Sequence, residues 1–256
     1  MDLFFNGELL NEYKSQSQIA RVLTESWVKT QMYCPRCGNS TVSNFENNRP
    51  VADFYCSKCG SQYELKSKKG VLGNKVVDGA YETMIDRITS NTNPDFFFMS
   101  YSEDTYKVNN FIMIPKHFFI PDIIEKRRPL ADTARRAGWV GCNILISKIP
   151  TQGMIEIICN GNEINKEIVV EKTARAGLLE TKDIASRGWL LDTLRCVNLI
   201  KSEVFELSDM YNYENLLSLS HPNNKNIKPK IRQQLQLLRD RGYIEFLGMG
   251  KYRKIL

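Results

Sequence analysis

Four cysteines arranged as two close pairs constrain the fold of this chain more than any other feature. The pairs are Cys34-Pro-Arg-Cys37 and Cys56-Ser-Lys-Cys59, and eighteen residues separate them. This spacing is typical of a tetrahedral zinc site in which four thiolates bind the metal. Gly38 and Gly60 follow the pairs and let the chain turn tightly around the metal. A disulfide or a redox-active C-x-x-C is the alternative, but we expect a structural Zn2+ site that does no chemistry itself.

Short segments rich in aromatic and aliphatic residues flank the second cysteine pair and are predicted to be strands. They span residues 51–55 and 62–66. If the second cysteine pair forms the turn between them, the strands pair antiparallel and Asp53 lies opposite Glu64. Alternation then places Glu64 and Lys66 on one face of the hairpin. Two carboxylates and one lysine are therefore predicted to converge.

This combination of side chains suits metal-assisted hydrolysis of a phosphodiester. Asp53 and Glu64 offer the oxygen ligands that Mg2+ prefers, and the backbone carbonyl of Leu65 is a further candidate ligand. Lys66 would orient or help to deprotonate the attacking water. The alternative is an ordinary surface ion pair on a hairpin.

The same residues carry a family resemblance. Pro50-x-x-Asp53 followed by Glu64-Leu65-Lys66 resembles the PD-(D/E)xK nuclease signature, although Pro50 is not adjacent to Asp53. More closely, the chain resembles the DpnI-like family of methyl-directed (type IIM) restriction endonucleases over nearly its whole length, and least between about residues 143 and 182. The specific matches are residues 45–56, 64–70, 133–139 and 231–240.

The resemblance implies a restriction-endonuclease-like α/β core with a mixed central sheet, an inserted four-cysteine zinc ribbon and a C-terminal winged-helix domain. It also implies Mg2+-dependent cleavage of double-stranded DNA at adenine-methylated GATC sites, as a defence against methylated foreign DNA. Asp53, Glu64 and Lys66 would be the catalytic residues.

Length and charge agree with a DNA-binding protein of one or two domains. The chain has 256 residues and a net charge of +6, which favours a polyanionic partner. The pattern of predicted helices and strands becomes less regular at about residues 171–182. We therefore expect a catalytic domain at 1–182 and a DNA-binding domain at 183–256. The first residues lack the pattern of a signal peptide, and no apolar run is long enough to span a membrane. We expect a soluble monomer in the bacterial cytoplasm.

Hydrophobic periodicity predicts the remaining core of the first domain. A helix is expected at residues 17–32. Its Glu25 is expected to be a solvated carboxylate, and a position facing the active site is the alternative. A second helix is expected to begin at Asp78, and buried strands are expected at 96–99 and 110–114.

Two basic segments of the first domain are candidate DNA contacts. Residues 67–75 are predicted to form a loop that follows the DNA backbone through Lys68 and Lys69, with a solvated surface loop as the alternative.

The second basic segment, residues 126–139, places Arg135 and Arg136 shortly before Trp139. Basic residues beside an aromatic suit phosphate contacts around a stacking residue. Composition alone favours a tryptophan in the core, whereas the resemblance implies that Trp139 lies where the methylated adenines are read.

The chain from residue 183 is predicted to be a winged helix. Helices are expected at 189–200, from Phe205 onward and at 229–241, and strands are expected at 243–247 and 251–256. Three helices followed by a hairpin are typical of this domain.

Polar residues of this domain are candidate contacts to the two grooves of DNA. Lys230, Gln233 and Gln236 lie away from the apolar side of the third helix, and glutamine can pair with adenine N6 and N7 in the major groove. The hairpin carries Lys251, Arg253 and Lys254, which suit phosphate or minor-groove contacts. A winged helix used for protein contacts is the alternative.

Two other functions compete with the nuclease. A zinc-ribbon and winged-helix DNA-binding regulator would keep the DNA contacts and leave Asp53, Glu64 and Lys66 structural. Nuclease chemistry based on histidine is disfavoured, because the chain has only His117 and His221 and neither lies near a metal-ligand cluster.

Overall fold

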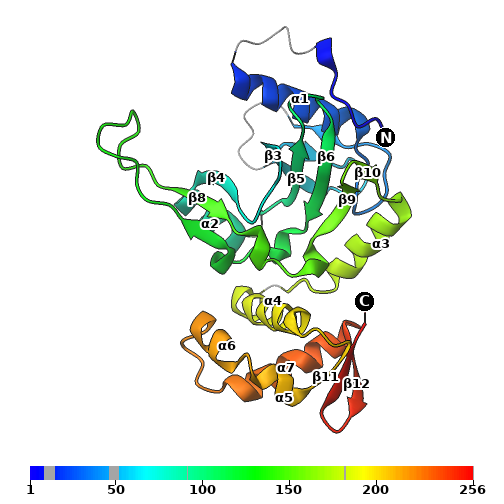
Figure 1. Ribbon diagram of the computed structural model, residues 1–256, viewed down its shortest axis with the longest axis vertical. Helices are drawn as coiled ribbons and strands as arrows, with labels where there is room; N and C mark the ends of the chain where they lie inside the picture. Colours follow the sequence, from blue (N-terminus) through cyan, green and yellow to red (C-terminus); the bar gives the residue numbers. More distant parts are fainter. Residues whose placement is uncertain (9–14, 46–51, 91, 182, 256) are drawn as a thin grey trace.

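The fold is given by a computed structural model, which describes residues 1–8, 15–45, 52–90, 92–181 and 183–255. Figure 1 shows two lobes, an N-terminal lobe built on a large sheet and a C-terminal lobe that begins at α4. The elements are α1 (Gln16–Gln31), β1 (Ser43–Asn44), β2 (Phe54–Tyr55), β3 (Gln62–Lys69), β4 (Val76–Ala80), α2 (Tyr81–Thr89), β5 (Asp95–Tyr101), β6 (Val108–Ile114), η2 (Lys116–Phe118), η3 (Pro121–Ile123), β7 (Ile124–Lys126), β8 (Gly141–Ile144), η4 (Ile146–Lys148), η5 (Thr151–Gly153), β9 (Ile155–Cys159), β10 (Asn162–Glu163), α3 (Lys166–Gly177), α4 (Ile184–Leu199), β11 (Val204–Glu206), α5 (Leu207–Tyr211), α6 (Glu214–Ser220), α7 (Ile227–Asp240), β12 (Ile244–Gly248) and β13 (Lys251–Lys254).

The central sheet of the N-terminal lobe is mixed, as predicted. Its strand order is β1-β2-β3-β5-β6-β9-β10. The strands β3 and β5 run parallel, whereas β5 and β6 run antiparallel. Every residue of β5 is buried, including three consecutive phenylalanines, Phe96, Phe97 and Phe98. The sheet is therefore covered on both faces at β5, which is why this strand is a nearly continuous apolar run rather than an alternating one.

The first helix packs against the central sheet through an apolar stripe. Leu23, Trp27 and Val28 are buried in α1 at helical spacing. The ring of Trp27 meets Phe111 of β6 at a centroid distance of 5.4 Å, and its indole nitrogen donates to the carbonyl of Asp2. The helix expected at residues 17–32 is thus confirmed.

A second, three-stranded sheet of order β4-β8-β7 lies beside the first. The helix expected to begin at Asp78 is wrong in its start, because Asp78 lies in β4 and pairs with Cys142 of β8, while α2 begins at Tyr81. The β-branched residues Val76 and Val77 favour the strand. Residues 127–140 connect β7 to β8 as a hairpin that projects from this sheet, drawn in green at the left of Figure 1.

The C-terminal lobe is a winged helix with a sheet of order β11-β13-β12. The helix expected from Phe205 begins later, since Phe205 lies in β11 and α5 starts at Leu207 behind a capping box that Glu206 forms with Asp209. The sequence reasoning missed α6. The third predicted helix is α7, and it buries Leu235 with its apolar neighbours as expected.

Direct contacts join the two lobes. The Arg175 side chain of α3 donates to the carbonyl of Ile255 at 2.6 Å, and the Tyr243 hydroxyl donates to the carbonyl of Arg175 at 2.7 Å. Within the N-terminal lobe, the ring of His117 lies 2.8 Å from the carbonyl of Ala176 in α3. Burial lowers the pKa of His117 to about 3, so this ring is neutral and structural.

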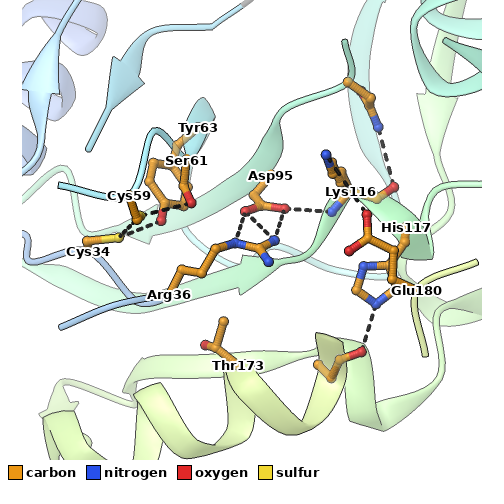
Figure 2. Close-up of polar contacts among 12 residues, drawn as sticks. Cys34, Arg36, Cys59, Ser61, Tyr63, Asp95, Lys116, His117, Thr173 and Glu180 are labelled. Carbon is orange, nitrogen blue, oxygen red and sulfur yellow. Dashed lines mark hydrogen bonds and ion pairs between the residues drawn. The ribbon is translucent and has the colours of Figure 1, made fainter. Parts of the chain in front are cut away.

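An ion pair between a partly exposed arginine and a buried aspartate connects the first cysteine knuckle to the central sheet. Arg36 lies between Cys34 and Cys37, and its guanidinium reaches both oxygens of Asp95, at 3.1 and 3.0 Å (Figure 2). Asp95 opens β5 and is 3% exposed, and it also accepts from the backbone N–H of Lys116 at 2.9 Å. A two-point contact of this kind fixes the knuckle in orientation as well as position.

We expect Arg36→Met to destabilise the protein by about 3 kcal/mol, because it leaves a buried carboxylate without its counter-ion. For a chain of this size the loss corresponds to a fall of roughly 6–12 °C in the midpoint of thermal unfolding. The double variant Arg36→Met/Asp95→Asn removes the stranded charge and should recover most of the loss. An equal fall in both variants would show that the loss does not come from the unpaired charge of Asp95.

Candidate active site and DNA-binding surfaces

The four predicted zinc ligands form one cluster. The sulfur atoms of Cys34, Cys37, Cys56 and Cys59 all lie within 4.8 Å of one another, and two of the pairs are 3.6 Å apart. A tetrahedron with zinc–sulfur bonds of about 2.3 Å separates its sulfur atoms by about 3.8 Å. The cluster therefore fits a zinc ion. Within the described part of the chain, it is the one group of three or more His, Cys, Asp or Glu side chains placed to hold a metal.

The two knuckles have the same backbone design. Gly38 has a φ of +70° and donates its N–H to the carbonyl of Cys34 at 2.9 Å, while Gly60 has a φ of +73° and donates to Cys56 at 2.9 Å. Residues with a side chain rarely adopt this left-handed conformation. The two glycines thus close the turns around the thiolates, as their positions predicted.

Hydroxyl groups next to the cluster contact its sulfur atoms. The Tyr63 hydroxyl lies 3.0 Å from the sulfur of Cys34, and the Ser61 hydroxyl lies 3.1 Å from the sulfur of Cys59. Tyr63 belongs to β3, is fully buried and stacks on Phe97 at 4.4 Å. The cluster is thereby connected to the strand that carries the acidic site.

The hairpin between β2 and β3 has the predicted register. Phe54 pairs with Tyr63, so Asp53, directly before β2, reaches the level of Glu64. The backbone N–H of Asp53 donates to the carbonyl of Tyr63 at 2.9 Å, and a carboxylate oxygen of Asp53 accepts from the N–H of Leu65 at 2.7 Å. The backbone of β3 thus orients the Asp53 carboxylate. Pro50 lies outside the described residues.

Lys66 lies between two carboxylates. Its ammonium group is 2.6 Å from Glu64 and also pairs with Asp78 of β4. Burial opposes a charge on Lys66, but the carboxylates of Glu64 and Asp78 outweigh it and raise the pKa of the lysine. The three predicted catalytic side chains therefore come together, with Lys66 protonated.

The sequence reasoning missed two members of this cluster. Asp78 was expected to begin a helix, and Arg87 of α2, which pairs with the second oxygen of Glu64, was not singled out. The strand propensity of Val76 and Val77 was the signal that could have placed Asp78. Nothing in the sequence alone pointed Arg87 toward Glu64, because α2 and β3 meet only in the tertiary structure.

Glu25 of α1, expected to be a solvated carboxylate rather than part of the acidic site, is partly exposed. Its side chain is 22% exposed and accepts from Arg21 at 2.7 Å. Burial raises the pKa of Asp53 against the effect of the Leu65 N–H, and the nearby charges of Glu64 and Glu25 add to the rise. The negative charges of Glu64 and Glu25 are thus close enough to act on Asp53, while Asp78 acts on Lys66.

The donor set of this point fits a hard divalent cation. Asp53 and Glu64 present carboxylate oxygens from adjacent segments of one hairpin, and a cation between them would relieve the repulsion that raises the Asp53 pKa. The ion pairs of Glu64 with Lys66 and Arg87 supply positive charge to the same carboxylate in this structure.

Trp139 lies on the projecting hairpin and is only partly buried, so it is not a core residue. The guanidinium of Arg136 lies 4.6 Å from the centre of its ring, and Arg135 is exposed beside it. The carbonyl of Trp139 accepts from the N–H of Leu130 at 3.0 Å, and Gly138 donates to the carbonyl of Leu130. These bonds close the hairpin and hold Trp139 near its base.

Lys68 and Lys69 are exposed but lie at the end of β3 rather than in a loop. The pairing of β3 with β5 continues through Lys69 and Tyr101, so the loop expected from residue 67 begins only at Gly70. Lys69 pairs with Glu103, and the ammonium group of Lys68 is 3.5 Å from the carbonyl of Leu72.

In the winged helix, α7 offers its polar face to solvent. Gln233 and Gln236 are exposed, whereas Lys230 is partly buried with its ammonium group 5.9 Å from the ring centre of Trp189. The glutamines are thus free to reach a groove without displacing a protein contact.

The three predicted cations of the wing each have an internal contact. Lys251 lies 3.6 Å from Glu206, and Arg253 lies 3.1 Å from Glu245. Lys254 donates to the carbonyl of Ile200, and burial lowers its pKa. DNA contacts by these side chains would have to replace such contacts.

Two family models match the chain. The DpnI model, described as the Dam-replacing family, matches residues 1–182. The chain belongs to this family. A second model, described as the Dam-replacing HTH domain, matches residues 185–254. Membership of the Dam-replacing family makes the chain a methylation-dependent restriction endonuclease of the DpnI type with a DNA-binding C-terminal winged helix. None of the described helices of this family member is long and apolar enough to cross a membrane.

We expect Tyr63→Phe to weaken zinc binding by roughly 10–100-fold, because the variant loses the hydroxyl beside the Cys34 sulfur. Competition with a chromophoric chelator measures the zinc affinity. Tyr33→Phe is the matched control, since Tyr33 is buried next to Cys34 but its hydroxyl has no hydrogen-bond partner within the described residues. Equal zinc affinities of Tyr63→Phe and wild type would refute the role of this contact.

We expect Asp53→Asn to raise the midpoint of thermal unfolding at pH 7 without divalent cations. Since the pKa of Asp53 is raised in the folded state, the unfolded chain ionises first as the pH rises, and the ionised side chain then costs stability. The advantage of the variant should shrink as the pH falls toward the ordinary pKa of aspartate, about 4. Calorimetry from pH 4 to 7 measures it, and a less stable variant at pH 7 would contradict the reasoning.

Proposed function

We propose that the chain is a Mg2+-dependent endonuclease that cuts double-stranded DNA at GATC sites carrying N6-methyladenine, as a defence against methylated foreign DNA. One observation carries the proposal. Asp53, Glu64 and Lys66 converge at one end of the β2–β3 hairpin in a chain of the Dam-replacing family. The chemistry of these groups suits hydrolysis of a phosphodiester.

Asp53 and Glu64, with the backbone carbonyl of Leu65, would hold Mg2+ in this site. Bound there, the ion would neutralise charge on the scissile phosphate and lower the pKa of a bound water. The protein keeps Asp53 in place through the N–H of Leu65 at 2.7 Å, so this carboxylate is oriented before any ligand arrives. Such preorganisation lowers the cost of assembling the site.

Lys66 would orient the attacking water and stabilise negative charge on the phosphate. Its ammonium group lies beside Glu64, and Asp78 pairs with it from the neighbouring sheet. When Glu64 turns to a cation, Asp78 can keep Lys66 charged and in place. The four cysteines would hold a structural Zn2+ that fixes the start of the hairpin.

The proposed contacts to DNA lie on both lobes. We assign catalysis to residues 1–182 and groove recognition to 183–256, an assignment that the matched ranges of the two family models support. Lys68, Lys69, Arg135 and Arg136 would follow phosphates, and Trp139 would pack on the N6-methyl groups.

In the second lobe, Gln233 and Gln236 would face adenine edges with Lys230 beside them. Lys251, Arg253 and Lys254 would contact the backbone once they exchange their internal partners for phosphates. We further propose that the protein acts as a monomer in the bacterial cytoplasm.

The test is cleavage of one plasmid prepared from adenine-methylating and non-methylating hosts, with Mg2+ or EDTA. We expect cutting of the methylated plasmid alone, and only with Mg2+. Asp53→Ala should not cut, and Lys66→Ala should lose at least about 100-fold in rate because the water is no longer oriented. Asp104→Ala is the matched control, since Asp104 is an exposed aspartate outside the acidic site.

Binding of DNA without cutting under every condition would overturn the nuclease proposal. The chain would then be a zinc-ribbon and winged-helix regulator, in which Asp53, Glu64 and Lys66 only stabilise the hairpin. Cutting that persists in Asp53→Ala would instead place the active site elsewhere.

A further inference from the structure

The ring of Trp139 occupies space that exists because residue 141 has no side chain. A Cβ atom built on Gly141 would lie 2.8 Å from each of two ring atoms, Cη2 and Cζ3. Gly141 is buried, and its backbone is not in the left-handed region that favours glycine. A residue with a side chain could therefore adopt this backbone, and what excludes it is the indole.

One contact to the ring and several backbone hydrogen bonds around it hold Trp139 in this position. The guanidinium of Arg136 lies over the ring at 4.6 Å, and the N–H of Trp139 donates to the carbonyl of Arg136 at 3.1 Å. Gly141 begins β8 and pairs with Ala80 of β4, while the N–H of Tyr81 donates to the carbonyl of Val140 at 3.1 Å. The base of the hairpin thus determines the position of the ring. This base is held in place by its hydrogen bonds to β4 and to the first residue of α2.

The Trp139 ring must be placed accurately, because the free energy gained by packing one methyl group against it is small. Burying one methyl group is worth on the order of 0.8 kcal/mol. A gap of roughly 0.5–1 Å already forfeits a quarter to a half of a dispersion contact. A Cβ at residue 141 would have to push the ring atoms from 2.8 Å to ordinary van der Waals distance, a shift of roughly 0.6 Å or more. Such a shift is large enough to spoil the packing of Trp139 on a methyl group.

We propose that Gly141 is a positioning residue that determines methyl specificity by letting the indole of Trp139 lie against β8. Gly141 acts only through Trp139 and does not touch DNA. The inference rests on the proposed function, in which Trp139 packs on the N6-methyl groups. It predicts that the discrimination between methylated and unmethylated sites depends on the size of residue 141.

The experiment compares Gly141→Ala with Gly79→Ala in the full-length protein. Gly79 lies in the adjacent strand β4, and a Cβ there would meet nothing within 4 Å, so this variant controls for the loss of a glycine. Fluorescence anisotropy without added Mg2+ or chelator gives the Kd of each zinc-loaded variant for two duplexes of one sequence, one with and one without N6-methyladenine in GATC. The discrimination ratio is the Kd for the unmethylated duplex divided by the Kd for the methylated duplex. We expect this ratio to fall at least about threefold in Gly141→Ala and to stay unchanged in Gly79→Ala.

Trp139→Ala and the double variant Trp139→Ala/Gly141→Ala separate the inference from the function on which it rests. We expect Trp139→Ala to lower the ratio and the added Gly141→Ala to change nothing further, because the clash has gone. Gly141→Ala should also lower the midpoint of thermal unfolding when it is added to the wild-type protein, but not when it is added to Trp139→Ala. This comparison distinguishes a clash with the ring from general misfolding.

An unchanged ratio in Gly141→Ala would overturn the inference, and the proposed role of Trp139 would stand if Trp139→Ala still lowered the ratio. If Gly141→Ala lowered the Kd ratio equally in the presence and in the absence of Trp139, the inference would also be overturned, since residue 141 would then not act through the indole. An unchanged ratio in Trp139→Ala would remove the role of Trp139 and with it the inference.

Discussion

The parallel pairing of β3 with β5 is the interaction on which the rest of the structure depends. It runs from Tyr63 to Lys69 on one strand and from Asp95 to Tyr101 on the other. Because side chains alternate along a strand, this register decides that Tyr63 turns toward the core and Cys34 while Glu64 and Lys66 turn toward the acidic site. A slip of one residue would exchange the two faces and dissolve both sites together.

The acidic site is a set of ion pairs between side chains of β3, β4 and α2. Lys66 pairs with Glu64 and Asp78, and Arg87 pairs with Glu64, so these cations occupy a carboxylate that the proposed nuclease chemistry needs. Removing one charge from such a partly buried set leaves the opposite charge without a partner. The site is therefore organised before a metal or DNA arrives, and ligands have only to exchange partners within it.

The small sheet β4-β8-β7 joins the acidic site to the surface that is proposed to recognise the methyl group. Asp78 of β4 pairs with Lys66, and the next strand, β8, opens with the glycine that accommodates Trp139. The proposed sites of recognition and of hydrolysis thus share one short stretch of strand pairing, in which Asp78 pairs with Cys142 and Ala80 pairs with Gly141.

The sequence by itself determined the features that depend on local spacing: the four-cysteine cluster, the antiparallel register that brings Asp53 to Glu64, the buried strand β5 and the recognition helix α7. Only the tertiary structure decided that Asp78 and Arg87 join the acidic site, because each comes from an element that meets β3 through packing rather than through sequence proximity. The need for a glycine beside Trp139 was likewise invisible, since it arises where two backbone segments approach in space. Periodicity and ligand spacing report which elements form, whereas the meeting of their side chains depends on how those elements pack.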